Sequence, residues 1–247
     1  MDRIAIVTGA TSGIGEAFIK LLKSRSDVDK IWVVGRNGEK LRTLAEDMVI
    51  SICADLSETI EPITERLRNE TPDVVFLINS AGLGTRQDFA STDEEKISAM
   101  LDVNCRALTL LTRAVIPYMK AGSKIINIAS SAGFLPQPGF TVYAASKSYV
   151  ISFSRAIRQE LKGKKITVTC VNPGPVETDF NRRATGSGEG FKGFRKSISK
   201  KPDEIAVKSL RAADKGKAML TPGMAEKLFR FAAKIIPHSW ILKLIKW

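Results

Sequence analysis

Short apolar stretches rich in β-branched residues alternate along the chain with longer segments whose apolar residues recur at helical spacing. The first two stretches are RIAIVT at 3–8 and KIWVVG at 30–35. Such alternation is typical of βαβ units, in which helices cover both faces of a parallel sheet. The sequence therefore predicts a doubly wound, Rossmann-type three-layer α/β/α sandwich with a seven-stranded parallel sheet. The other predicted strands lie at 48–53, 73–79, 123–130, 165–172 and 217–220, and the predicted helices at 13–24, 38–47, 58–69, 93–119, 141–161 and 203–213.

The predicted elements leave room for one domain only. A length of 247 residues is at the upper end of what a single sheet with its helices holds, so we expect residues 1–247 to form one dinucleotide-binding catalytic domain. Gly, Ser, Lys and Arg are frequent from Asn181 to Lys200. We interpret residues 181–202 as a loop that covers the substrate, and a plain solvated insertion is the alternative.

A glycine-rich turn follows the first predicted strand directly. It reads TGATSGIG at 8–15 and is followed by the amphipathic segment EAFIKLLK. Its glycines permit a tight turn and bring backbone N–H groups and a helix N-terminus close to a pyrophosphate. This strand–turn–helix context indicates a dinucleotide-binding turn. The cofactor-binding residues predicted here are Gly9, Thr11, Ser12, Gly13, Ile14 and Gly15.

The end of the second predicted strand bears on the choice between NAD and NADP. In NAD-binding units an acidic residue about 20 positions beyond the turn accepts a hydrogen bond from the ribose 2′-hydroxyl. Counted from Gly15, that place falls on Gly35, and Arg36 follows. No carboxylate there would repel a 2′-phosphate, and the neighbouring guanidinium is suited to bind one. We therefore expect NADP(H); the alternative is that Arg36 merely begins a surface turn.

Two further strand ends are expected to contact the cofactor. Asp55 and Leu56 follow the third strand, and Asp55 is well placed to reach the adenine edge. The fourth strand ends in NSAG at 79–82, where small residues allow the backbone to approach the cofactor. We therefore add Asn79, Ala81 and Gly82 to the predicted cofactor-binding residues.

Tyr143 and Lys147 lie four positions apart in a segment of helical period, so both side chains leave the same face. A tyrosine with an ordinary pKa of about 10 is a poor base at neutral pH. An adjacent ammonium group stabilises phenolate, so we expect Lys147 to bring the pKa of Tyr143 toward the working range. The pair could then protonate a developing alkoxide or deprotonate an alcohol. Alone, however, such a pair occurs by chance in many helices.

The other motifs along the chain, and the order in which they occur, support a functional role for Tyr143 and Lys147. The motifs are TGATSGIG at 8–15, NSAG at 79–82, Asn104 in DVNCRAL, Ser130 in NIASSAG, YAASK at 143–147 and NPGPVET at 172–178. With these motifs in this order, residues 1–180 resemble the short-chain dehydrogenase/reductase family.

The resemblance implies a role for each matching residue. Tyr143 would be the general acid/base, and Lys147 would lower its pKa and hold the nicotinamide ribose. Ser130 matches the serine that hydrogen-bonds the substrate carbonyl, with Ser131 as the adjacent alternative, and Asn104 matches the residue that holds a water in the proton relay. The segment expected to flank the nicotinamide contains Pro173, Gly174, Val176 and Thr178. NSAG departs from the commoner NNAG, but not at a catalytic position.

The reaction implied is hydride transfer between NADP(H) and a ketone or aldehyde, with the alcohol as the other partner. The resemblance also implies a homodimer or homotetramer. Apolar residues near the expected pocket rim favour a hydrophobic carbonyl of steroid, retinoid or acyl type, although they also fit plain core packing. They are Phe134, Leu135, Phe140 and Phe180, and the predicted substrate-binding residues are Ser130, Phe134, Phe140, Tyr143 and Phe180.

The formal charge of +12 changes the picture once it is divided along the chain. Residues 1–180 carry 22 Lys and Arg against 21 Asp and Glu, whereas residues 181–247 carry 16 against 5. The basic tail at 224–247 places Leu228, Phe231, Ala232 and Ile235 on one helix face, with Lys227, Arg230 and Lys234 largely opposite. Together with Trp240 and Trp247, this pattern favours a helix lying on an anionic membrane surface. Packing on the protein's own body or across a subunit interface is the alternative.

Composition also bears on location and on metals. Cys53, Cys105 and Cys170 are widely spaced and form no CxxC pair, so we interpret them as core thiols in a reducing compartment. The single histidine, His238, excludes a multi-histidine metal site, and we expect no metal. The chain begins with a strand, and no apolar run approaches the ~18 residues of a membrane-spanning helix. We expect a cytoplasmic protein, peripheral at the inner membrane face if the tail binds lipid.

Two other function classes fit the sequence less well. A non-catalytic dinucleotide-binding sensor or membrane-surface scaffold would be expected to have lost Ser130, Tyr143 or Lys147, and none of them is lost. A nucleic-acid-binding role for the basic last quarter lacks stacking aromatics and a recognised fold, so we expect no nucleic-acid partner.

Overall fold

A single parallel sheet organises the computed structural model, which describes residues 1–180, 184 and 199–244. Its strand order is β3-β2-β1-β4-β5-β6-β7. The order reverses between β1 and β4, where the chain crosses from one half of the sheet to the other. The strands are β1 (Arg3–Thr8), β2 (Lys30–Gly35), β3 (Val49–Cys53), β4 (Asp73–Asn79), β5 (Lys124–Ile128), β6 (Thr167–Val171) and β7 (Met219–Leu220).

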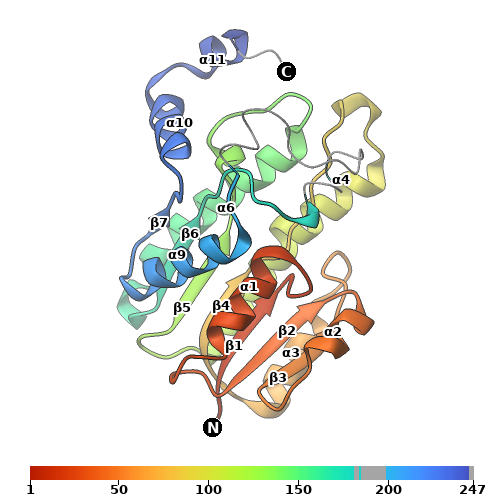
Figure 1. Cartoon of the computed structure of the whole chain (residues 1–247), viewed down its shortest axis with the longest axis vertical. Coiled ribbons are helices and arrows are strands. Elements are labelled where there is room, and N and C mark those ends of the chain that lie inside the picture. Colours follow the sequence, from red (N-terminus) through yellow and green to blue (C-terminus); the bar gives the residue numbers. More distant parts are fainter. Residues whose placement is uncertain (181–183, 185–198, 245–247) are drawn as a thin grey trace.

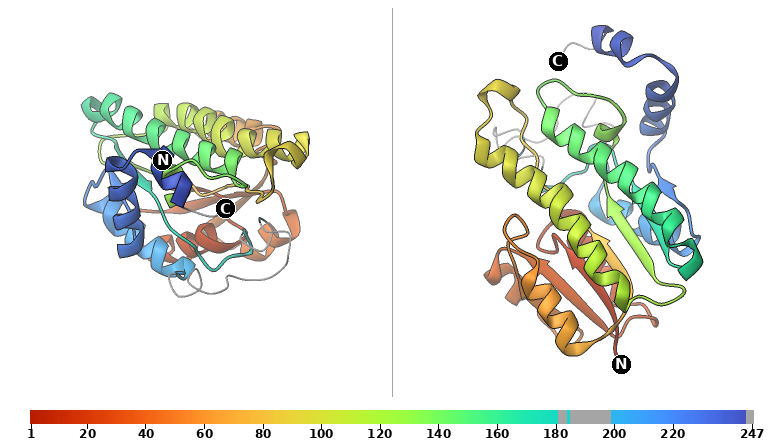
Figure 2. Two further views of the ribbon diagram at one scale, coloured as in Figure 1. Left: turned by 90° about the horizontal axis from the view of Figure 1, so that it is seen from above. Right: turned by 180° about the vertical axis from the view of Figure 1, so that it is seen from behind.

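Helices cover both faces of this sheet (Figures 1 and 2). Because side chains alternate along a strand, Ala5 and Val7 of β1 join the core beneath α1, α2 and α9, whereas Ile4 and Ile6 join the core beneath α3, α5 and α6. The predicted three-layer sandwich is thereby confirmed. The helices are α1 (Gly13–Leu22), α2 (Gly38–Leu44), α3 (Glu61–Glu70), α4 (Glu94–Leu101), α5 (Leu108–Val115), α6 (Thr141–Glu160), α9 (Pro202–Asp214), α10 (Met224–Ile235) and α11 (His238–Leu244), with short 3-10 turns at Phe89–Ser91, Ile116–Tyr118, Ser131–Phe134 and Lys162–Lys164.

The single helix predicted at 93–119 is wrong in one respect that matters for the site. A wider π-helical segment, Asp102–Ala107, separates α4 from α5, and a 3-10 turn containing Pro117 ends the element. A π segment inserts an extra residue into a helix and rotates the side chains that follow it, which a 3.6-residue period does not predict. Asn104 lies in this segment.

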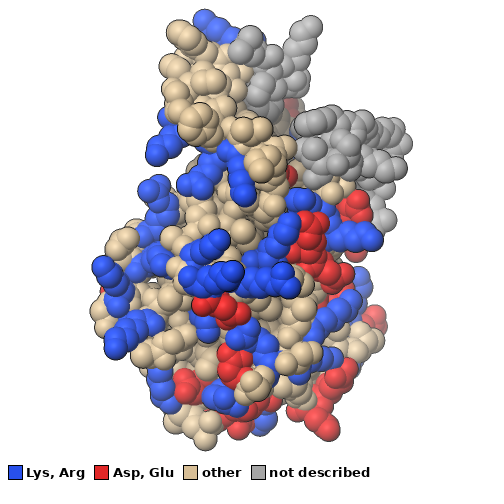
Figure 3. Space-filling view, turned by 60° about the vertical axis from the view of Figure 1, so that its left-hand side comes forward, with Lys and Arg blue, Asp and Glu red and all other residues tan. Residues whose placement is uncertain are grey.

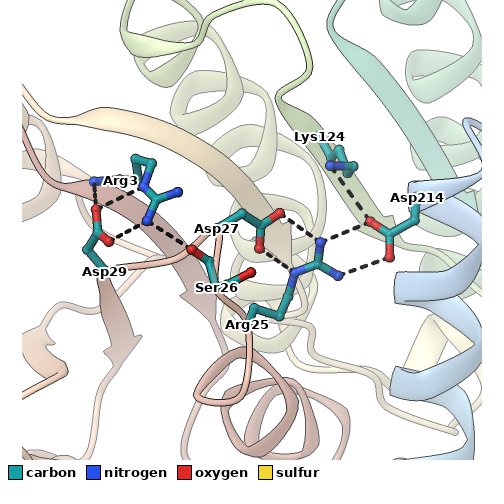
Figure 4. A network of polar contacts seen from close by, with 7 residues as sticks. All are labelled: Arg3, Arg25, Ser26, Asp27, Asp29, Lys124 and Asp214. Atoms are coloured by element: carbon teal, nitrogen blue, oxygen red, sulfur yellow. Dashed lines mark hydrogen bonds and ion pairs between the residues drawn. The ribbon is translucent and has the colours of Figure 1, made fainter.

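A polar network ties together the amino edge of the sheet, away from the predicted site (Figure 4). Arg25, in the loop after α1, binds Asp27 and reaches Asp214 at the end of α9, with an Nη1–Oδ2 distance of 2.9 Å. Lys124 at the start of β5 lies 3.7 Å from the same Asp214 carboxylate. The Arg25 side chain is largely buried, and its bonds to Asp27 and Asp214 hold its pKa above the ordinary value. The network joins the two halves of the sheet.

The expectation of core thiols holds for Cys170, which is buried, but is wrong for Cys53, whose side chain is exposed at the end of β3. The predicted loop at 181–202 lies mostly outside the described residues. Of its members, Ala184 is buried, Lys200 forms a parallel bridge with Val176, and Pro202 already belongs to α9.

The last two helices, α10 and α11, stand beyond the carboxyl edge of the strands, at the opposite end of the molecule from the N-terminus (Figures 1 and 2). Among the described residues, no helix combines the length and the apolar character needed to cross a membrane.

Candidate active site

The glycine-rich turn connects β1 to α1 at the carboxyl edge of the sheet. Gly9 and Gly13 have φ angles of 66° and 60°, in the left-handed region that glycine adopts without strain. A Cβ on Gly15 would lie 2.2 Å from the Gly9 carbonyl oxygen, so only glycine allows this turn to close. Ser12, the N-cap of α1, forms no side-chain capping bond. The helix N-terminus and the Ser12 hydroxyl are thus available to an anionic group.

The end of β2 lies beside this turn. A Cβ on Gly35 would be 3.1 Å from the Thr11 methyl group, so the residue that follows, Arg36, emerges close to the glycine turn. The Arg36 side chain is largely exposed, and its Nη1 lies 3.6 Å from the Asp55 carboxylate. Asp55 also accepts hydrogen bonds from the backbone and hydroxyl of Ser57. The structure therefore brings together the two residues predicted for the ribose and adenine ends.

The end of β4 closes against the same turn. The Thr8 hydroxyl oxygen accepts hydrogen bonds from the backbone N–H groups of Ser80 and Ala81, both at 3.1 Å. Asn79 is buried, and its amide donates to Thr112 and to Asn127. Because the Asn79 side chain points into the protein, its predicted contact with the cofactor would have to come from the backbone.

Asn104 lies in the π-helical segment, and its buried side chain bonds two other parts of the chain. Its Nδ2 donates to the Leu83 carbonyl oxygen and to Ser146 Oγ, and its Oδ1 accepts from the Leu83 N–H, all at 2.9 Å. A Cβ on Gly82 would lie 3.5 Å from Asn104 Oδ1 and 3.4 Å from Lys147 Nζ. Asn104 and Lys147 therefore border the same point at Gly82, the last residue of the NSAG segment.

Tyr143 and Lys147 both lie on α6 and are almost completely buried. The Lys147 Nζ donates to the Ile128 carbonyl oxygen at 2.9 Å and lies 5.6 Å from the centre of the Tyr143 ring. Burial lowers the pKa of Lys147 to about 8. This value leaves the ammonium group charged at neutral pH but close to the range in which it loses its proton.

The expected lowering of the Tyr143 pKa is not found in the protein without its ligands. Burial raises the pKa of the Tyr143 phenol to about 12, although a hydrogen bond with the Ser130 hydroxyl opposes this rise. The physical reason is that burial disfavours phenolate, while Lys147 directs its ammonium group to a backbone carbonyl. The phenol is therefore protonated at neutral pH, which is the state that donates a proton.

Ser130 follows the end of β5, and its side chain is buried. Its Oγ accepts a hydrogen bond from the Ala132 N–H and so begins the 3-10 turn Ser131–Phe134. Ser131, the alternative, directs its backbone N–H to the Pro173 carbonyl oxygen. The influence of the Ser130 hydroxyl on the pKa of Tyr143 favours Ser130 as the serine beside the reacting group.

Aromatic rings surround Tyr143. Phe140 stacks on its ring with a centroid distance of 4.2 Å, and Phe180 lies at 5.4 Å in a tilted arrangement. A Cβ on Gly84 would lie 2.6 Å from the Phe180 ring and 3.0 Å from the Tyr143 ring. The wall beside the phenol is thus apolar on these sides. Phe134 is half-buried in the neighbouring 3-10 turn and makes no ring contact with Tyr143 among those the structure describes.

The segment after β6 contacts both α10 and the glycine turn. Near the start of this segment, a Cβ on Gly174 would lie 2.0 Å from the carboxylate of Glu226 on α10. Four residues later, the Thr178 methyl group would lie 2.8 Å from a Cβ on Gly13, so the segment reaches the glycine turn. The segment that contains Pro173, Gly174, Val176 and Thr178 therefore runs from the contact with α10 to the glycine turn.

Glu226 and Gly84 were not found from the sequence. Glu226 is only 5% exposed, and its Oε1 has no hydrogen-bond partner among the described residues. A Cβ on Gly223 would also collide with this carboxylate, so it sits in a recess made by two glycines. The spacing of Gly223 and Glu226 is that of a helix N-cap and its third residue, but nothing in the sequence reveals the approach of Gly174 from another part of the chain.

Metal ligands do not converge in the described part of the chain, where no three His, Cys, Asp or Glu side chains lie together as such ligands would. A surface pocket of about 310 Å³ lies between α3 and α5, and none of the predicted site residues lines it.

The residues present fit a dinucleotide. The glycine turn, the uncapped Ser12 at the start of α1, and the segment that runs from Gly174 to the glycine turn all lie at the carboxyl edge of the sheet. The turn of α1 would hold the pyrophosphate, Arg36 a 2′-phosphate, and Lys147 the nicotinamide ribose. When bound, a reduced nicotinamide would supply the hydride for reduction of a carbonyl.

Comparisons with known proteins agree with this geometry. A family model described as short chain dehydrogenase matches residues 3–187. Sulfoacetaldehyde reductase 2 of Chromohalobacter salexigens is 35% identical over 203 residues, which cover 76% of this chain and 79% of the relative. A 3-oxoacyl-(acyl-carrier-protein) reductase of Chlamydia trachomatis is 32% identical over 235 residues, covering 90% and 94%.

Solved structures share the whole fold. A short-chain dehydrogenase of Burkholderia cenocepacia in complex with NADP superimposes with a TM-score of 0.83 at 24% identity, covering 100% of this chain and 98% of that one. A short-chain dehydrogenase of Sphingobium yanoikuyae in complex with NADPH has a TM-score of 0.78 at 25% identity, covering 99% and 96%. The family model spans most of the chain and the related reductases align over three quarters of it or more, so the chain belongs to the short-chain dehydrogenase family of oxidoreductases.

Proposed function

We propose that this oxidoreductase uses NADP(H) to interconvert a ketone or aldehyde and the corresponding alcohol. The observation that carries the proposal is the buried Tyr143 phenol, which is placed one helical turn before Lys147 and whose pKa is influenced by the Ser130 hydroxyl. In reduction, Ser130 and Tyr143 would both donate hydrogen bonds to the carbonyl oxygen, and Tyr143 would give its proton to that oxygen as charge develops on it. The raised pKa of the phenol keeps this proton in place until then.

The test of this role is Tyr143→Phe, which keeps the ring between Phe140 and Phe180 and removes only the hydroxyl. We expect a loss of turnover of about 10³-fold or more, in the range of general acid–base catalysis together with a lost oxyanion donor. NADPH binding, followed by its fluorescence, should stay within a few-fold of wild type. Near-normal turnover in this variant would refute the assignment.

The preference for NADP(H) is supported by Arg36. Two similar structures hold NADP or NADPH and two others hold NADH, so the fold accepts either cofactor. Arg36→Leu should weaken NADPH binding strongly and leave NADH binding nearly unchanged, because only NADPH carries the 2′-phosphate. The matched control is Arg42→Leu, which makes the same change at an exposed arginine of the neighbouring helix α2. An equal loss of NADPH and NADH binding in Arg36→Leu would refute the preference for NADP(H).

We propose a hydrophobic substrate of steroid, retinoid or acyl type. The support is the apolar wall of Phe140 and Phe180 beside Tyr143. The related reductases act, by their names, on sulfoacetaldehyde and on a 3-oxoacyl-(acyl-carrier-protein), so the carbonyl class is shared while the rest of the substrate differs. Oxidation of NADPH with a panel of steroid, retinoid, acyl, sugar and short-chain carbonyls tests this. A clear preference for short polar carbonyls would overturn it.

A homodimer or homotetramer in the cytoplasm completes the proposal. On α5 and α6, the exposed Leu110 and Tyr149 offer apolar area for a subunit contact, and light scattering of the purified protein would reveal the oligomer. The free thiols suit a reducing compartment, since Cys53 is exposed and forms no disulfide. A peripheral position at the inner membrane face belongs to the same proposal.

A further inference from the structure

The helix α10 carries an apolar stripe that faces solvent. Met224, Leu228, Phe231 and Ile235 follow one another at spacings of four, three and four residues, which places them within about 60° of arc on one side of the helix. Each is between 62% and 70% exposed. Most other large apolar side chains of the described protein lie in its cores, so this row is unusual and has no cover within the described chain.

The opposite side of α10 is the one that packs on the protein. Ala233 and Glu226 are buried there, and Glu226 lies against Gly174 of the segment after β6. Helix α10 therefore packs on the protein's own body through its narrow opposite side, and the apolar stripe takes no part in that contact. The stripe points away from the domain.

Basic residues accompany the stripe on one flank, rather than opposite it as the sequence suggested. Lys227, Arg230 and Lys234 are exposed at about 70° to 130° from the centre of the stripe. The acidic residue of α10, Glu226, is buried. The exposed charge of this helix is thus wholly positive, and in Figure 3 Lys and Arg side chains border the uncharged surface at the top of the molecule, where Figure 1 places α10 and α11.

The apolar surface continues into α11. His238 Nε2 lies 3.0 Å from the Ala233 carbonyl oxygen and so holds the turn at Pro237. Beyond this turn, the Trp240 ring is 64% exposed, and Lys243 is exposed on the same short helix. An indole with lysines nearby is the pattern found at the boundary between lipid headgroups and acyl chains.

We propose that α10 and α11 form a docking face that lies in the headgroup region of an anionic lipid bilayer. The face consists of Met224, Leu228, Phe231, Ile235 and Trp240, with Lys227, Arg230, Lys234 and Lys243 around it. It rests on the peripheral location proposed above, but not on the carbonyl activity. A second copy of the chain is a poorer occupant, because stripe-on-stripe contact would bring the basic flanks of both copies together with no exposed acid on α10 to pair with them.

Vesicle sedimentation tests the face with the full-length protein. We expect the wild type to sediment with phosphatidylcholine vesicles that contain phosphatidylglycerol, and to do so less with phosphatidylcholine alone or at high salt. Leu228→Glu with Phe231→Glu should lower the partition coefficient about a hundredfold, because each large apolar side chain contributes roughly a tenfold factor. Replacing Lys227 and Lys234 by Gln should lower it about fivefold for each charge.

The matched control is Phe89→Glu with Leu101→Glu, which makes the same chemical change at exposed residues of another surface and should leave sedimentation unchanged. Far-UV circular dichroism and the unfolding temperature establish folding of each variant independently of any activity. In a Trp247→Phe background, brominated lipid should quench Trp240, since the third indole, Trp32, is fully buried.

Equal sedimentation of the wild type and the Leu228/Phe231 variant would overturn the proposal. So would a wild-type dimer that this variant converts to a monomer while neither protein binds vesicles, because the face would then be a subunit contact. Absence of carbonyl reductase activity, with sedimentation as expected, would contradict the proposed function and leave the docking face standing.

Discussion

Replacement of Asn104 by Ala separates the structural and the catalytic contributions of the π-helical segment. The change removes three hydrogen bonds of 2.9 Å, two with the backbone of Leu83 and one with Ser146. A typical intramolecular hydrogen bond contributes about 1 kcal/mol net, so we expect the free energy of unfolding to fall by about 3 kcal/mol. For a chain of this size that corresponds to a drop in unfolding temperature of roughly 6 to 12 °C.

The comparison variant is Ser146→Ala, which removes one of these three bonds together with the bond that Ser146 Oγ donates to the Tyr143 carbonyl oxygen, and leaves both Leu83 bonds intact. It should lower the unfolding free energy by about 2 kcal/mol. Both variants are measured by urea unfolding, followed by assays at a temperature where each is folded. Because Asn104 and Lys147 border the same point at Gly82, we expect kcat to fall at least about tenfold in Asn104→Ala and to stay within about twofold in Ser146→Ala.

Two results would contradict this reasoning. Unfolding of Asn104→Ala at the wild-type urea midpoint would mean that Asn104 does not hold Leu83 in the folded protein. Equal losses of kcat in the two variants would mean that Asn104 acts only by supporting α6, and that it has no part in the proton relay.

Three further predictions rest on charges and close contacts. With a pKa of about 8, Lys147 loses its charge as pH rises, so kcat/KM for NADPH should decline above about pH 8. Lys147→Met should abolish this decline. A wild-type profile that stays flat to high pH would argue against a role for the charge. Gly174→Ala should displace the Glu226 carboxylate and raise KM for NADPH, whereas adding Glu226→Ala should restore it; additive effects in this double-mutant cycle would exclude the contact. Asp214→Asn should lower the free energy of unfolding by about 1 kcal/mol without changing kcat, because its partner Arg25 lies at the amino edge of the sheet; a changed kcat would be unexpected.

Much of the fold follows from local patterns. The alternation of apolar strands and periodic helices predicts the sheet and its cover on both faces, and the side chains of β1 alternate between the two resulting cores. The family and its oxidoreductase class follow from motif order, and the comparisons confirm both. The predicted binding of NADP(H) is consistent with the NADP and NADPH held by two similar structures, while two others hold NADH, so the preference itself rests on Arg36.

The features that the sequence did not predict depend on contacts between distant segments. The π-helical segment breaks the very period from which helices are predicted, and it is fixed by the bonds of Asn104 to Leu83 and Ser146. The pKa of Tyr143 depends on how deeply the folded chain buries the phenol and on the carbonyl to which Lys147 donates. Neither depth nor that partner can be read from a spacing of four residues.

The contact of Glu226 with Gly174 and Gly223 has a consequence for comparative sequence studies. The carboxylate occupies the volume where a side chain on either glycine would stand, so the three positions cannot vary independently. Among relatives that keep α10, those with a larger residue at the place of Gly174 should carry a shorter one at the place of Glu226. Covariation between these positions would show in which relatives the last helices contact the segment after β6, and so how far the C-terminal region can be exchanged between family members.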